Sequence, residues 1–288
     1  MSAPLLFDHA FRAHSLRRLE PDTVLLPMVA EELAIRLNTV MREFPLAIDL
    51  GTQGPGLAEA IRAVHSVGQV VQAADAGGDI ISGKHALPYE PGSLDLVVSG
   101  LALQWADDLP GLLLQIRRAL KPDGLFLAAL AGGDTLTELR QSFAEAEADV
   151  VGGMSPRVVP FATVQDLGAL LQRAGFALPV VDAEKLTVRY ADVFGLFRDL
   201  RALGATNSLL SRSRTPLRRD VLARLAEIYQ ERYSDPDGRL RVTVEIVWLS
   251  GWAPHESQQK PLRPGSATHR LADALNAKEI PSGVKPGS

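Results

Sequence analysis

The sequence contains no cysteine among its 288 residues. This absence excludes disulfide bonds, thiolate metal sites, iron–sulfur ligation and a cysteine nucleophile. No stretch reaches the roughly 18 uncharged apolar residues that a membrane-spanning helix requires, so the sequence predicts no integral membrane insertion and leaves peripheral association open. The chain also carries no excess of positive charge. The formal charge of −4 and the pI near 5.9 argue against a nucleic-acid partner.

Histidine is scarce and is not spaced as a metal ligand would be. Six histidines occur, none in a His-x-x-x-His pattern, so the sequence predicts no preformed metal site. His255 and Glu256, in the polar C-terminal region, are candidates for a base or for a pair of metal ligands. The N-terminus acquires Asp8 and Glu20 within its first twenty residues, which is unlike a signal or transit peptide. We therefore expect a bacterial cytoplasmic protein.

In the first half of the chain, short apolar runs alternate with helical patterns. The expected strands are residues 46–50, 69–74, 94–99 and 125–130, and the expected helices are residues 22–37, 57–64 and 108–120. This alternation predicts an α/β fold, a mostly parallel sheet with helices on both faces. The length leaves room for one large domain, or for one domain with an attached subdomain.

The pattern changes beyond Ala131. We expect a helix, a strand and two further helices at residues 163–175, 176–181, 192–203 and 218–233. Residues 240–248 alternate with a period of two, which predicts a half-exposed strand, antiparallel, at the late end of the sheet. The predicted organisation is a helical lead-in at 1–43, an α/β domain at 44–253 with a helical insertion at about 190–235, and a polar tail at 254–288.

The segment DLGTQGPG, residues 49–56, follows the first expected strand. Glycines at a strand-to-helix turn let backbone N–H groups approach a ligand, at a helix N-terminus that favours negative charge. Asp75 ends the second expected strand, where an acid accepts hydrogen bonds from ribose hydroxyls. The candidates for binding a nucleoside cofactor are therefore Asp49, Gly51, Gly54, Gly56 and Asp75. The alternative is a tight turn beside a solvent-facing aspartate.

Residues 86–126 resemble the class I S-adenosylmethionine-dependent methyltransferases of type 11. The matching positions are Leu87-Pro88-Tyr89, Asp95 to Ser99, Gln104-Trp105 and Leu120 to Gly124. The resemblance implies a Rossmann-like methyltransferase sheet and S-adenosylmethionine as the cofactor. It adds as cofactor-binding candidates Leu87, Ser99, Gln104 and Trp105. Trp105 either lines the methionine end of the pocket or packs in the core.

Two departures from the methyltransferase pattern affect the cofactor site. The usual motif is Asp-x-Gly-x-Gly-x-Gly, whereas this chain has Gln53 and Pro55 at the second and third glycine positions. Only 18 residues separate Asp75 from Leu94. A single βαβ unit takes about 30 residues, so we expect an outer strand or helix to be missing or shortened.

Four later segments resemble a narrower family, the methyltransferase-related assembly factors of respiratory complex I. They are GGDTLTELR (132–140), SPRVVPF (155–161), DLGALLQRAGF (166–176) and WAPHESQQKPLRPGSAT (252–268). Mitochondrial members hydroxylate an arginine of a complex I iron–sulfur subunit, so the resemblance implies that activity and that partner. Two alternatives remain. One is a methyltransferase acting on a small molecule or acyl carrier, and the other is a non-catalytic chaperone with an eroded cofactor pocket.

The catalytic candidates lie outside the glycine turn. Asp134 and Arg140 follow the last strand of the first half, at the carboxyl edge where open α/β sheets bind ligands. A structural ion pair is the alternative for these two. With His255 they form the predicted catalytic set, and Trp105 is expected on the substrate side.

Overall fold

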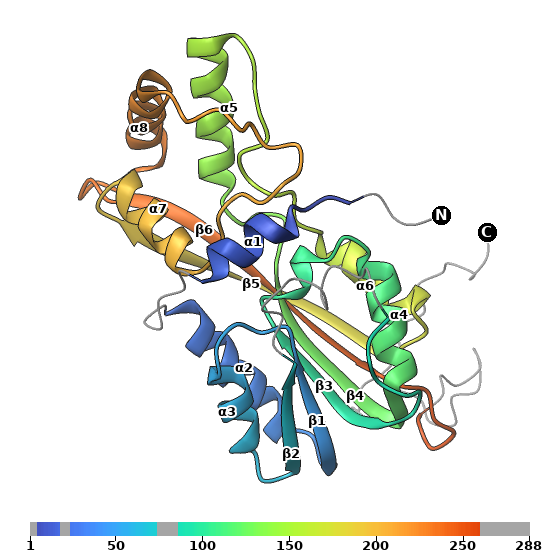
Figure 1. Cartoon of the computed structure of the whole chain (residues 1–288). Helices are drawn as coiled ribbons and strands as arrows, with labels where there is room; N and C mark the ends of the chain where they lie inside the picture. Colours follow the sequence, from blue (N-terminus) through green and yellow to red (C-terminus); the bar gives the residue numbers. More distant parts are fainter. Residues whose placement is uncertain (1–4, 18–23, 74–85, 260–288) are drawn as a thin grey trace, which may run out of the picture. The chain divides into compact units, whose positions relative to one another are not determined.

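The computed structural model describes residues 5–17, 24–73 and 86–259. The chain divides into two units, Met1–Pro254 and His255–Ser288. The fold below is that of the first unit, drawn in Figure 1. None of the helices in the described ranges is long and apolar enough to cross a membrane.

The described strands form one six-stranded sheet in the order β2-β1-β3-β4-β6-β5. They are β1 (Phe44–Leu50), β2 (Val67–Ala73), β3 (Leu94–Gly100), β4 (Leu120–Ala131), β5 (Ala177–Tyr190) and β6 (Leu240–Trp252). The first four are parallel to one another, whereas β6 lies antiparallel between β4 and β5. The predicted Rossmann-like methyltransferase sheet is confirmed. Among the described strands β2 lies at the edge, and residues 74–85, which hold Asp75, are not described.

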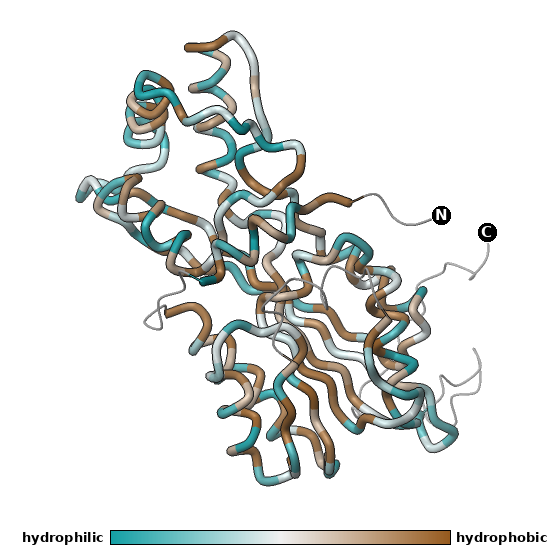
Figure 2. The backbone as a smooth tube through the Cα atoms, viewed as in Figure 1, coloured by the Kyte–Doolittle hydropathy of each residue, from teal (hydrophilic) through white to brown (hydrophobic). Residues whose placement is uncertain are grey.

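Helices cover both faces of the sheet (Figure 1). They are α1 (His9–Leu16), α2 (Leu25–Asn38), α3 (Gly56–Arg62), α4 (Leu109–Ala119), α5 (Thr137–Val151), α6 (Val164–Arg173), α7 (Val193–Ala202) and α8 (Arg219–Tyr233), with a 3-10 turn at Leu103–Trp105. Helices α2 and α3 pack on one face, and α4 and α6 on the other. In Figure 2 the apolar colour runs along the central strands that these two layers enclose.

Local sequence explains where the covering helices begin and which side they bury. Asp108 caps α4 by accepting a hydrogen bond from the N–H of Gly111 at 2.9 Å. Thr163 and Asp166 form a reciprocal capping box at the start of α6. On the opposite face, Leu33 of α2 is fully buried against the sheet, in a cluster that also contains Trp248 of β6.

A third apolar cluster lies beyond the main sheet layers. The paired ends of β5 and β6 extend past the other strands towards α5, α7 and α8 (Figure 1). The cluster contains Phe143 of α5, Leu196 of α7, Tyr229 of α8 and Val242 of β6. Helices α5, α7 and α8 therefore form a separate group beside the carboxyl edge of the parallel strands.

Several expected elements differ from those observed. Strand β5 runs for 14 residues rather than ending at Val181, because its far half pairs with β6 although many of its side chains are exposed. Strand β6 is antiparallel as expected but mostly buried rather than half-exposed, because it lies inside the sheet. Strand β4 begins at Leu120 and includes Asp123 at a positive φ of 65°. Helix α5 was not predicted, and α1 lies within the helical lead-in expected at 1–43 although no helix was placed at its residues.

Candidate functional site

The glycine turn lies at the carboxyl end of β1. Gly51 and Gly54 adopt φ of 74° and 73°, the left-handed region that favours glycine. The N–H of Gly51 donates to Ala73 at the end of β2 at 3.0 Å, so the turn is tied to the neighbouring strand. A Cβ added at Gly54 or Gly56 would meet no atom within 4 Å, so the turn faces open space there. Gln53 donates back to the Gly51 carbonyl at 3.2 Å.

Asp49 lies beneath this turn with no exposed surface. Within the described part of the chain, neither of its carboxylate oxygens accepts a hydrogen bond. Burial raises the pKa of Asp49 to about 6, and the nearby polar groups of Thr52 and the Arg62 charge oppose this rise only in part. The site therefore contains a buried acid next to the glycine turn whose charge is compensated only in part.

The segment after β3 borders the turn. Ser99 is buried and donates to the Leu50 carbonyl at 2.7 Å, which joins β3 to the end of β1. The amide nitrogen of Gln104 donates to the Leu101 carbonyl at 2.8 Å. Its amide oxygen is buried and, among the described residues, has no hydrogen-bond partner. Leu87 contacts a different region, where its N–H donates to Gln115 of α4 at 2.7 Å.

Trp105 is 5% exposed and is both a packing residue and a wall of the site. The Arg12 guanidinium of α1 stacks on its ring at 3.9 Å, and Phe7 meets it edge-on at 5.5 Å. Helix α1 is fixed there by a 2.7 Å contact between His9 and Asp107, both almost fully buried. Trp105 therefore packs in the core and also lines a pocket, and its role at the methionine end of a cofactor stays a prediction.

One pocket connects the glycine turn to the β5–β6 pair. Its cavity volume is about 360 Å³, and its walls are mostly apolar. It runs from the glycine turn and the segment after β3, past the end of β4, to α7 and β6. Its polar lining groups include Arg12, Gln53, Gln104, Tyr190, Asp199 and Glu245. The hydroxyl of Tyr190 donates to Asp199, and burial together with this bond raises the pKa of Tyr190.

Glu245 is the buried acid of this pocket, at 8% exposure. Its Oε2 accepts the backbone N–H of Asp134 at 3.0 Å, while the Asp134 side chain is exposed and lies 2.5 Å from Lys185. Arg140 donates to the Gly133 carbonyl at 3.0 Å. Asp134 thus belongs to the loop that holds Glu245, Arg140 of α5 binds that loop at Gly133, and no hydrogen bond or ion pair within the described ranges joins Asp134 to Arg140.

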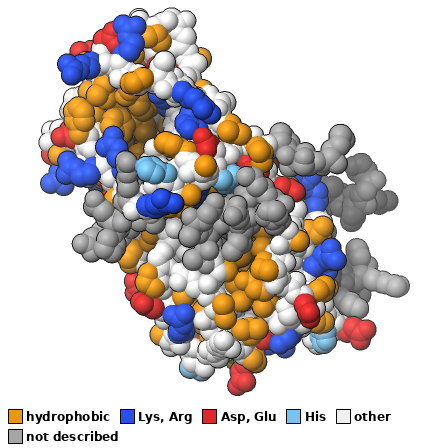
Figure 3. Space-filling model, in the orientation of Figure 1, with side chains coloured by type: hydrophobic (Ala, Val, Ile, Leu, Met, Phe, Trp, Pro, Cys, Tyr) orange, Lys and Arg blue, Asp and Glu red, His pale blue; other side chains and the backbone are white. Residues whose placement is uncertain are grey.

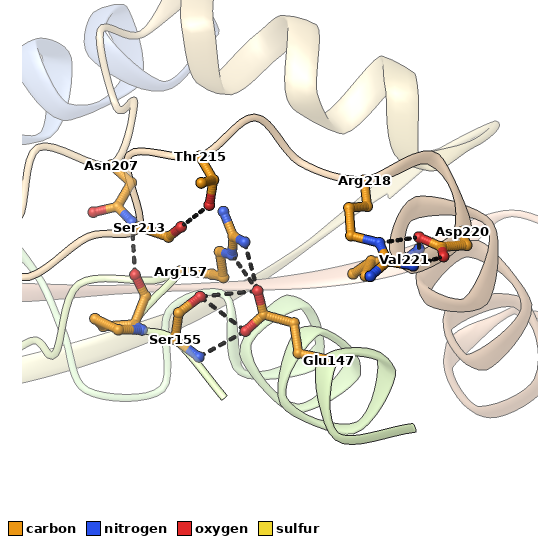
Figure 4. Close-up of polar contacts among 10 residues, drawn as sticks. Glu147, Ser155, Arg157, Asn207, Ser213, Thr215, Arg218, Asp220 and Val221 are labelled. Atoms are coloured by element: carbon orange, nitrogen blue, oxygen red, sulfur yellow. Dashed lines mark hydrogen bonds and ion pairs between the residues drawn. The ribbon is translucent and has the colours of Figure 1, made fainter. Parts of the chain in front are cut away.

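A second loop completes the apolar wall. Arg157 and the backbone and hydroxyl of Ser155 bind the Glu147 carboxylate, and Asn207 donates to the Pro156 carbonyl at 2.8 Å (Figure 4). These bonds fix the segment that leads to Phe161, which lines the pocket. On the face drawn in Figure 3, hydrophobic side chains gather around a hollow in the upper half, the region of α5, α7 and α8.

The structure does not bring all predicted residues together. Asp75 lies outside the described residues. His255 is exposed and belongs to the second unit, where its Nδ1 lies 2.7 Å from the Ser257 hydroxyl. The described ranges contain no group of three or more His, Cys, Asp or Glu residues placed to hold a metal ion.

Sequence reasoning missed four polar groups of the pocket. Arg12 lies in the expected lead-in, and Tyr190 and Asp199 flank the start of the expected insertion. Glu245 stood on the polar side of the alternating strand and was therefore expected in solvent. The signal that could have found it is a lone acid between apolar neighbours in a strand of nine or more residues.

Comparison with known proteins gives the relationships of the chain. The methyltransferase domain family matches residues 58–128. The mitochondrial arginine-hydroxylase NDUFAF5 of Rattus norvegicus is 38% identical over 266 residues, covering 88% of this chain and 77% of that protein. A malonyl-[acyl-carrier protein] O-methyltransferase of Halorhodospira halophila (strain DSM 244 / SL1) is 42% identical over 168 residues, 58% of this chain and 55% of that protein. The crystal structure of BH2331 from Bacillus halodurans C-125 superposes with a TM-score of 0.50 at 15% identity, over 78% and 99% of the two chains, and shows a shared fold.

These relationships correct one expectation. The Rattus norvegicus relative, which matches 88% of the chain, is named a mitochondrial protein. The expectation of a bacterial cytoplasmic protein, which came from the acids near the N-terminus, is therefore wrong. Two early acids were too little to decide a compartment.

Proposed function

Since the chain belongs to the arginine-hydroxylase NDUFAF5 family, we propose that it hydroxylates an arginine side chain of an iron–sulfur subunit of respiratory complex I. The observation that carries the proposal is a pocket that joins the glycine turn to the β5–β6 pair. Its apolar walls suit the methylene stem of a long side chain. Its two carboxylates, Asp199 and Glu245, suit a cationic end.

The proposed reaction replaces one carbon–hydrogen bond of the arginine by a carbon–hydroxyl bond. Dioxygen supplies the oxygen atom, and its second atom leaves as water. This requires two electrons and two protons from a reductant outside the chain. The pocket's contribution is to hold the side chain and exclude water, through buried walls such as Trp105 and Phe161.

We also propose that S-adenosylmethionine binds at the glycine turn. The fit rests on the Gln104 amide oxygen, a buried acceptor with no hydrogen-bond partner among the described residues, and on the Asp49 carboxylate, a buried acid that Thr52 and Arg62 compensate only in part. Both favour a cationic ligand, and Gln104 lines the pocket. Gly51 and Gly54 would give the ligand access to the backbone, and Asp75 remains the candidate for the ribose. When bound, this cofactor supplies an activated methyl group.

Methyl transfer to an acyl carrier substrate is the second candidate. Arg12 favours it, since this guanidinium lines the pocket and is a natural partner for an acidic acceptor. In the structure Arg12 already stacks on Trp105 and lies 3.4 Å from the Gly204 carbonyl. Its charge is therefore less available than those of the two carboxylates.

Two experiments test these proposals. The purified chain, the candidate iron–sulfur subunit, dioxygen and a reductant are incubated together, and mass spectrometry of the subunit should show an arginine heavier by one oxygen atom. A product heavier by one methyl group, or no product, would contradict hydroxylation. Calorimetric titration with S-adenosylmethionine should show binding that Gln104→Ala weakens. Gln172→Ala, at an exposed position of α6, is the matched control.

A further inference from the structure

We propose that Glu245 is the carboxylate that binds the guanidinium of the substrate arginine and that it determines the charge preference of the pocket, with Asp199 as a second carboxylate. This inference rests on the proposed function, since it assigns the residues that recognise its substrate. Neither residue was a candidate in the sequence.

The loop after β4 is shaped around the Glu245 carboxylate. Gly132 leaves the room that this group occupies, because a Cβ there would come within 2.4 Å of Glu245 Oε2. The N–H of Gly132 donates to the Glu245 carbonyl at 2.8 Å, and Thr135 exchanges hydrogen bonds with its backbone at 3.0 and 3.1 Å. The N–H of Asp134 then holds Oε2 at 3.0 Å. The carboxylate is therefore fixed in place before any ligand arrives.

The charge of Glu245 is only weakly compensated. The Lys185 ammonium lies 3.9 Å from Oε1, but it lies 2.5 Å from Asp134 and is 59% exposed. Arg12, the cation of the pocket wall, stacks on Trp105. A buried carboxylate held by neutral donors and left with spare acceptor capacity favours a cationic ligand that donates hydrogen bonds.

Asp199 offers a second acceptor from the other wall. Its Oδ2 accepts the hydroxyl of Tyr190, and both residues line the pocket. Helix α7 supplies Asp199, whereas β6 supplies Glu245, so the two carboxylates come from separate elements. A guanidinium carries five N–H donors in one plane, so it can donate hydrogen bonds to carboxylates on two sides at once. An ammonium or a neutral group fits two such carboxylates less well.

The test is titration of the full chain with two matched ligands, Nα-acetyl-L-arginine amide and Nα-acetyl-L-citrulline amide. The second replaces the guanidinium by a neutral urea of nearly the same shape. We expect wild type to prefer the arginine ligand, and Glu245→Gln to weaken its binding by about 10- to 100-fold while leaving citrulline binding little changed. Asp199→Asn should have the same selective effect on binding of the arginine ligand. This variant tests the inference if Glu245→Gln fails to fold.

The matched control is Glu184→Gln, which removes the same charge from an exposed position on the neighbouring strand β5. It should leave both ligands unaffected. Equal binding of the arginine ligand by wild type and by both pocket variants would overturn the inference, and so would equal binding of the two ligands by wild type. Monomethyl malonate is titrated in parallel, and a preference for this anion would also overturn it. Mass spectrometry of the iron–sulfur subunit tests hydroxylation independently of these titrations. A failure of the proposed function can therefore be distinguished from a failure of the inference about Glu245.

Discussion

Replacing Asp49 by asparagine should stabilise the protein at neutral pH. The carboxyl has no exposed surface, and burial raises its pKa from 3.8 to about 6, against smaller opposing effects of Thr52 and Arg62. Between about pH 4 and 6 the folded protein keeps a proton that the unfolded chain has already released. The free energy of unfolding therefore falls as the pH rises through this window.

The size of the effect follows from the difference in pKa. A difference of about 2 corresponds to about 3 kcal/mol, since each pKa unit is worth about 1.4 kcal/mol. This destabilisation is fully present above about pH 6 and absent below about pH 4. Asparagine keeps the shape of the side chain and carries no charge. The free energy of unfolding of Asp49→Asn should thus exceed that of wild type by up to about 3 kcal/mol near neutral pH. Near pH 4 the two values should differ little.

The assay is urea unfolding of both proteins at these two pH values. Asp95→Asn is the matched control, because Asp95 pairs with Lys121 at 2.9 Å and accepts the Leu46 N–H at 3.0 Å. That variant should lose stability, by about 1 kcal/mol. Two results would refute the conclusion that burial raises the pKa of Asp49. One is a lower stability of Asp49→Asn than of wild type near neutral pH, and the other is an effect on stability that does not depend on pH.

Three further substitutions test the packing and the site. Leu33→Ala should lower the free energy of unfolding by about 2–5 kcal/mol in urea, since Leu33 is fully buried. A loss below about 1 kcal/mol would contradict the core assignment. Asp108→Ala removes the cap of α4 and should cost about 1 kcal/mol in the same assay, and no change would argue against that hydrogen bond. Gly132→Ala should cost about 1–3 kcal/mol and weaken binding of the arginine ligand, because its Cβ would displace the Glu245 carboxylate; unchanged binding would contradict the fit of the loop.

The sequence was sufficient for the parallel half of the fold. Apolar runs such as residues 46–50 and 94–99 are short and bounded by turns, and the helices between them bury one side. The spacing of apolar residues is regular where a helix buries one side only, as at Leu112 and Ile116 of α4. The resemblance to methyltransferases then predicted a Rossmann-like sheet, whereas the order of the strands was not predicted.

The sequence was insufficient where tertiary contacts determine the element. Helix α5 carries acids and alanines, and its buried side depends on packing against α8 and the extended β6. The far half of β5 carries Asp182, Glu184 and Lys185, which a period-two pattern does not mark as strand. These residues are in a strand because β6 pairs with them along its whole length.

Glu245 was missed for the same reason. An alternating strand is normally covered on one face, so its polar positions are assigned to solvent. Strand β6 lies inside the sheet and has layers on both sides, which buries Glu245 together with its apolar neighbours. A buried carboxylate needs donors, and the segment GGDTLTELR supplies one through the N–H of Asp134, while the N–H of Gly132 donates to the backbone carbonyl of Glu245. The segment that was predicted to be catalytic thus contacts an acid more than one hundred residues later in the chain, and the register of β4 with β6 explains why the two meet.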